Sequence, residues 1–103
     1  MSKRGKSILQ PNLTRSSKKC FITGRADNIQ VHHIFGGSNR KISDRMGFWV
    51  YLTQEIHNGN DPGAVHNNPN QGYDLMLKQL CQRKYEEENT RENFIALIGK
   101  SYL

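Results

Sequence analysis

The sequence predicts an α+β fold, because two short strand patterns precede two helical ones. Residues 29–32 alternate apolar and polar side chains, and residues 48–53 are dense in aromatic and β-branched side chains, as is typical of strands. From about residue 73 to 88, and again from about 90 to 98, apolar side chains recur at helical spacing. We expect these two C-terminal helices to pack together and to support the strands.

Start and stop signals bound each of these elements. The Gly36-Gly37 pair ends the first strand, and the polar residues 38–47 predict a surface loop. Thr53 follows the second strand and is placed to cap a short helix that carries His57. The last helix has a cap at Asn89 or Thr90 and a stop at Gly99.

Length and cysteine content place further limits on the protein. A chain of 103 residues is enough for one domain. Cys20 and Cys81 are far apart and do not resemble a disulfide scaffold, so we expect a reducing cytoplasm, with Cys81 packed on the apolar face of its helix. No apolar run approaches the ~20 residues that span a bilayer, and no secretory signal is evident, so we expect no membrane partner.

The positive charge is concentrated at the N-terminus. The first nineteen residues contain six basic side chains and no acid, so the formal net charge of +6 lies in this segment. We predict a basic, flexible arm over residues 1–19 that attracts DNA or RNA through its phosphates; a solvated tail that only aids solubility is the alternative. The candidate nucleic-acid-binding residues of this arm are Lys3, Arg4, Lys6, Lys18 and Lys19.

All four histidines lie between residues 32 and 66, and two of them are adjacent. Neighbouring side chains of a strand point to opposite faces, so where the strand ends, one imidazole of the His32-His33 pair can bind a metal while the other faces the site beside it. Imidazole is the commonest neutral ligand of transition metals and accepts a proton near pH 7. Histidines that only satisfy hydrogen bonds are the alternative for the pair alone. His57 and His66, which follow the next strand, favour a metal site.

The stretch VHHIFGG at residues 31–37, the strand WVYL at 49–52 and the following His57 together resemble the HNH endonuclease superfamily, the ββα-metal or His-Me finger nucleases. The longer runs HHIFGGSNRK, GFWVYL and IGKSYL are similar to small HNH proteins of phages and prophages, including recombination-associated nucleases. The resemblance implies an HNH-like nuclease domain over residues 20–103, with a ββα-metal core and two C-terminal helices behind the basic N-terminal arm.

The resemblance also implies roles for individual histidines. His32 occupies the metal-ligand position of the family, His33 the position of the general base, and His57 that of the ligand on the helix. His66 completes the metal site if the loop after His57 folds back. The ring of His33 needs an orienting partner on its other nitrogen, for which we expect a backbone carbonyl.

Two features depart from the family pattern. The family's central Asn corresponds to Phe48 here, and Asn39 in the glycine loop is the nearest candidate for its catalytic role of holding the base or the metal. Many relatives hold a structural zinc ion between two Cys-x-x-Cys pairs, of which only Cys20 remains. We expect hydrophobic packing to replace that zinc site.

These assignments predict a metal-dependent endonuclease that hydrolyses phosphodiester bonds in DNA, with His33 as the base beside one divalent ion. The ion is zinc, nickel, manganese or magnesium, and histidine ligands favour the transition metals. Arg40 and Lys41 are candidates for contacting phosphates. The alternatives are a catalytically inactive HNH-fold module that only binds nucleic acid, and a phage protein that binds a host protein. A phage-encoded chain is expected in the cytoplasm of its bacterial host, and the sequence predicts no oligomeric state.

Overall fold

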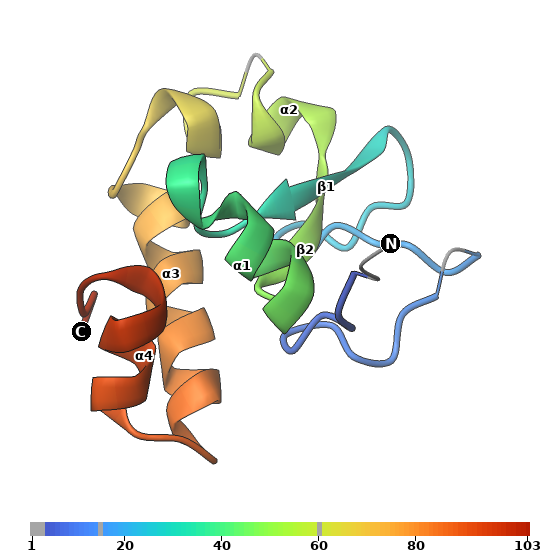
Figure 1. Cartoon of the computed structure of the whole chain (residues 1–103). Helices are drawn as coiled ribbons and strands as arrows, with labels where there is room; N and C mark the ends of the chain where they lie inside the picture. The colour runs from blue at the N-terminus through green and yellow to red at the C-terminus, as the bar shows by residue number, and fades with distance from the viewer. Residues whose placement is uncertain (1–3, 15, 60) are drawn as a thin grey trace.

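A two-stranded antiparallel sheet stands at the centre of the molecule (Figure 1). The computed structural model describes residues 4–14, 16–59 and 61–103. The strands are those predicted from the sequence: β1 (Ile29–His33) and β2 (Trp49–Thr53). Ile29 lies opposite Thr53 and His33 opposite Trp49, which places the paired histidines at the end of β1. With four α-helices in the described residues, the predicted α+β class is confirmed.

The residues after the glycine pair are helical, so the prediction of a loop over residues 38–47 is wrong. They form a short 3₁₀ turn, η1 (Gly37–Asn39), followed by the helix α1 (Arg40–Met46). Ile42 and Met46 lie one turn apart and both pack against the core, which gives this polar segment a buried face. Gly47 ends the helix in the left-handed region, with φ of 78°, and its N–H bonds the carbonyl of Ser43.

The second strand continues directly into a short helix that carries a histidine. Helix α2 (Gln54–His57) begins after Thr53, which stands at the predicted cap position but makes no capping hydrogen bond through its side chain. A loop then leads to a second 3₁₀ turn, η2 (Val65–Asn67). His57 therefore ends α2, and His66 lies in η2.

The two predicted C-terminal helices are present, as α3 (Gly72–Glu86) and α4 (Arg91–Ile98). They lie side by side on one flank of the sheet (Figure 1). Thr90 caps α4 by accepting a hydrogen bond from the Asn93 N–H, and Gly99 ends it with φ of 111°. Among the described residues, no helix is long and apolar enough to cross a membrane.

The core lies between the sheet and this helix pair. Phe48 stands where the HNH resemblance would place a central Asn. It is fully buried and packs edge-on against Tyr85, with 5.7 Å between the ring centroids. Cys81 is buried as predicted, and Cys20 and Cys81 are both free thiols. The buried apolar cluster comprises Cys20, Ile34, Phe35, Phe48, Val50, Leu52, Ile56, Val65, Leu77, Cys81, Phe94 and Ile98.

The N-terminal arm follows the outer side of β2 (Figure 1). Its described residues contain no regular helix or strand, as expected, yet the arm is attached to the body by specific hydrogen bonds. Ser7 is buried and donates its hydroxyl to the Trp49 carbonyl, and the Trp49 indole donates to the carbonyl of Gly5 at 2.7 Å. Ile8 packs against the core. Over these residues the arm therefore contacts the body through specific bonds and packing.

Candidate metal centre

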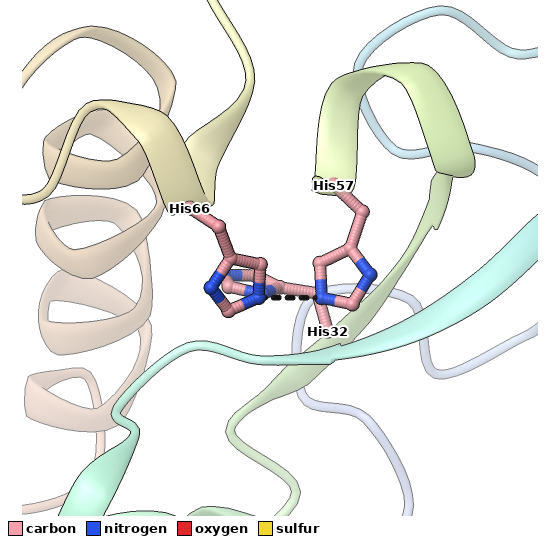
Figure 2. A group of neighbouring side chains, drawn as sticks. All are labelled: His32, His57 and His66. Carbon is pink, nitrogen blue, oxygen red and sulfur yellow. Dashed lines mark hydrogen bonds between the residues drawn. The ribbon is translucent and has the colours of Figure 1, made fainter. Parts of the chain in front are cut away.

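Three of the four histidines converge from three separate elements. His32 comes from β1, His57 from α2 and His66 from η2, and their rings face one another (Figure 2). One ring nitrogen from each lies within 4.8 Å of the others, and the Nε2 atoms of His57 and His66 are 2.9 Å apart. The predicted grouping of these three side chains is confirmed, including the loop that brings His66 back to His57.

The tautomer of His57 is set by Gln30. The Nδ1–H of His57 donates to Gln30 Oε1 at 2.7 Å, because an amide oxygen can only accept. The Nε2 atom of His57 therefore carries its lone pair toward the cluster, where it accepts a hydrogen bond from His66 Nε2–H. Gln30 was not predicted from the sequence to be a site residue. Its position indicated the role, since Gln30 stands two residues before His32 and so shares its face of the strand.

The ring of His32 is buried without any hydrogen bond. Only 4% of the residue is exposed, and neither Nδ1 nor Nε2 has a partner among the described residues. An unsatisfied buried polar atom costs about 1–3 kcal/mol, so native structures contain few of them. One of these two nitrogens is therefore free to act as a metal ligand beside the two further imidazoles.

The electrostatics of the cluster favour the neutral forms of His32 and His57. Burial, reinforced by the neighbouring histidines, lowers the pKa of His32 from 6.5 to about 3. Burial and the proximity of His66 lower the pKa of His57 to about 4. Histidine binds metals in its neutral form, so at neutral pH these two rings need release no proton to bind a cation.

The donor set fits a divalent transition-metal ion. Three imidazoles with room for a fourth ligand form a common arrangement for catalytic zinc, in which nitrogens about 2.0–2.1 Å from the ion lie roughly 3.3 Å from each other. The observed separations, from 2.9 Å up to the 4.8 Å limit, bracket that spacing. Binding requires His66 to hold its proton on Nδ1 instead of Nε2.

The cluster opens into a cleft that also contains the candidate base. Its volume is about 320 Å³, and His33 and Arg40 line it together with the three clustered histidines. Gly36 and Gly37 form part of its wall, and Gly37 has a φ of 58°, a conformation that favours glycine. His33 therefore lies in the same cleft as the three histidines, although it is not one of them.

A basic groove adjoins this cleft, and His33 lines both. The groove has a volume of about 620 Å³. Its lining residues are Arg4, His33, Arg40, Lys41, Asp44 and Arg45. Arg40, Lys41 and Arg45 are exposed along α1, so the helix replacing the expected loop presents three cations on one side of His33.

The partner of His33 differs from the one predicted. Its Nε2 lies 2.9 Å from Oδ1 of Asp44, a residue of α1 that our sequence analysis did not select, and not beside a backbone carbonyl. Asp44 would have been a candidate if residues 40–46 had been predicted as a helix. The signal was present in the sequence, since Ile42 and Met46 are four residues apart and Gly47 follows them.

Other predicted site residues lie away from the histidines. Asn39 donates its amide to the Ile98 carbonyl at 2.8 Å, so the structure ties it to the end of α4 and does not bring it to the base or the metal ligands. Lys6, Lys18 and Lys19 are exposed on the arm, outside the lining of the groove. Lys3 lies outside the described residues.

Comparison of the chain with known protein families, curated proteins and solved structures gives no match. The functional assignment therefore depends on the geometry of the site.

Proposed function

We propose that the chain is a metal-dependent endonuclease of the ββα-metal, or HNH, class that hydrolyses phosphodiester bonds in DNA. One observation carries the proposal. A cluster of three imidazoles shares a cleft with a fourth histidine, and that fourth histidine borders a groove lined by cations. A metal site, a base and a phosphate-binding surface then lie next to each other.

The order of elements supports the class. Two antiparallel strands are followed at once by a short helix, and the candidate ligands lie at the end of the first strand and on that helix. This is the arrangement that the HNH resemblance implies for His32, His33 and His57. Helix α1 is inserted between the two strands and supplies most of the groove.

The proposed chemistry divides among the residues as follows. His32, His57 and His66 would hold a divalent ion, which would supply positive charge to stabilise the phosphate oxygens and the departing 3′ oxygen. His33, which the resemblance places as the general base, accepts a proton from the attacking water. Arg40 and Lys41 hold the flanking phosphates, a contact that fixes position without reading sequence.

A specific observation favours the alternative of an inactive module that only binds nucleic acid. Phe48, which stands at the position of the HNH family's Asn, lies in the core, and Asn39, the candidate for that Asn's role, donates instead to the Ile98 carbonyl of α4. The basic groove does not depend on them, so binding would survive where catalysis had been lost.

Cleavage of supercoiled plasmid separates the two functions. After chelator treatment, the parent and His33→Ala are compared with magnesium, manganese, nickel and zinc, and each ion's binding is measured in parallel by calorimetry. We expect metal-dependent nicking by the parent and at least a 100-fold lower rate for His33→Ala, the usual scale for loss of a general base. Metal affinity should be unchanged, because His33 is outside the cluster of three.

Either of two results contradicts the endonuclease proposal. Absence of cleavage by the parent with every ion, together with salt-sensitive DNA binding by both proteins, would establish the binding module. Equal cleavage by the parent and His33→Ala would remove His33 from the mechanism.

A further inference from the structure

An acidic residue stands in the middle of the basic groove. Asp44 is the one carboxylate among the six described residues that line it. A carboxylate repels phosphate, so Asp44 lowers the affinity of the groove for a polyanion. We therefore expect Asp44 to do something other than contact the phosphate backbone of DNA.

The contacts of Asp44 indicate that role. Its Oδ1 atom accepts two hydrogen bonds, one from Nε2–H of His33 at 2.9 Å and one from Nε of Arg4 at 2.8 Å. The Asp44 side chain is 35% exposed, whereas that of His33 is only 12% exposed. The backbone is fixed as well, because the Asp44 carbonyl accepts from the Gly5 N–H at 2.7 Å.

We propose that Asp44 is the positioning residue of the His33 base, in the role for which the family uses its central Asn. The inference rests on the proposed endonuclease function. The carboxylate can only accept, so it holds the His33 proton on Nε2 and leaves Nδ1 with its lone pair. Nδ1 makes no hydrogen bond within the described residues and is the atom that takes the proton of the attacking water.

The proton and electron balance of the step is simple. As the water oxygen bonds to phosphorus, one water proton passes to Nδ1 and the ring becomes an imidazolium held by Asp44, which stays ionised. The bond from phosphorus to the 3′ oxygen breaks with its electron pair on that oxygen, which takes a proton from solvent. The imidazolium later returns its proton to solvent.

Because Arg4 also donates to Asp44, the substitution Asp44→Asn can test whether Asp44 orients the His33 ring. Arg4 lies over the Trp49 ring, 5.5 Å from the ring centroid, while its Nε donates to Asp44. In Asp44→Asn, an amide nitrogen turned toward Arg4 and His33 would face two donors, so both neighbours favour the orientation in which the amide oxygen accepts. Asp44→Asn should therefore preserve the His33 tautomer, whereas Asp44→Ala cannot.

The decisive experiment combines a spectroscopic readout with kinetics. In ¹⁵N-labelled, metal-free full-length protein near pH 7.5, we expect the Nε2 proton of His33 to exchange slowly enough to be detected in the parent and in Asp44→Asn. It should be absent in Asp44→Ala. With the ion that supports cleavage, Asp44→Ala should lower kcat by about 10–100-fold, the scale for loss of an orienting partner. Its KM should be equal or lower, because an anion has left the groove.

A control and a set of outcomes complete the test. Asp27→Ala removes another exposed Asp–Arg ion pair, with Arg25, and should leave both readouts unchanged. Persistence of the His33 ring proton in Asp44→Ala, or a loss confined to KM, would overturn the proposal. If the parent does not cleave DNA, the ring proton still decides whether Asp44 positions His33, so failure of the endonuclease function is distinguished from failure of this inference.

Discussion

Gln82 and His32 are both buried polar side chains, but only Gln82 has hydrogen-bond partners among the described residues. Gln82 is fully buried on α3, and its amide nitrogen donates to Glu86 and Ser101 while its oxygen accepts from the Tyr102 N–H. His32 is almost as buried on β1, yet both of its ring nitrogens lack a partner among the described residues.

The difference separates a polar group that stabilises the fold from a candidate metal ligand. Two of the hydrogen bonds of Gln82, those with Ser101 and Tyr102, attach the C-terminal segment to α3, and the third joins it to Glu86 within the helix; all three contribute to stability. The unpaired nitrogens of His32 lower stability, because a buried polar atom has lost its hydrogen bonds to water without gaining others. Burial alone therefore does not identify the site; a buried ring that is unsatisfied and next to two other ligand-type side chains does.

The largest expected effect concerns metal-linked stability. At a free zinc or nickel concentration 1,000 times the Kd, the parent should gain about 4 kcal/mol of unfolding free energy. His32→Leu, which keeps an apolar side chain in the space, should gain almost none, while its metal-free stability equals or exceeds that of the parent. Urea unfolding with and without the ion measures both values. A full metal-induced gain in His32→Leu would show that His32 is not a ligand.

The next effect is a loss of stability in acid. The folded pKa values of His32 and His57 lie at about 3 and about 4, below the 6.5 of the unfolded chain. The unfolded state therefore binds protons first, and stability that is complete above pH 6.5 falls as the pH drops toward 4. Between pH 7 and 5 we expect metal-free protein to lose about 2 kcal/mol from His32 and somewhat less from His57, which is more exposed. The same unfolding series on His32→Leu should show about half the loss; an equal loss would contradict the assignment to His32.

The smallest effect tests the structural side of the comparison. Gln82→Met keeps the size of the side chain but removes its hydrogen bonds and leaves the Tyr102 N–H without its acceptor. We expect a loss of about 2 kcal/mol in calorimetric or urea unfolding. Metal affinity should be the same as in the parent, so a reduced affinity would show that the two regions are coupled.

Most of the fold was predictable from the sequence because its elements have local signals. The alternation in β1, the aromatic run of β2, the Thr90 cap and the Gly99 stop each act within a few residues. Helix α1 was missed because its polar residues resemble a loop. Only two of its apolar side chains, Ile42 and Met46, pack against the core, and its fully buried residue, Ser43, is polar.

The histidine cluster was predictable for a different reason. Its residue types are rare and chemically specific, so composition and the HNH resemblance together selected His32, His57 and His66. The partners Gln30 and Asp44 were missed because ordinary polar residues acquire meaning only from what they contact. Asn39 was selected on residue type alone, and its amide is taken by a carbonyl of α4, a contact spanning 59 positions that no local pattern predicts.

The docked arm has one more consequence, for self-association. A strand at the edge of a sheet offers free N–H and C=O groups that can pair with another chain, and this is a frequent origin of domain swapping and fibrils. On the outer side of β2, the Ser7 hydroxyl donates to the Trp49 carbonyl. The Tyr51 N–H donates to Gln10 Oε1, and the Tyr51 carbonyl accepts from the Phe21 N–H. A second copy could add a strand along this edge only after the arm and the segment around Phe21 had moved away, so the segment that carries the positive charge also covers the β2 edge of the sheet.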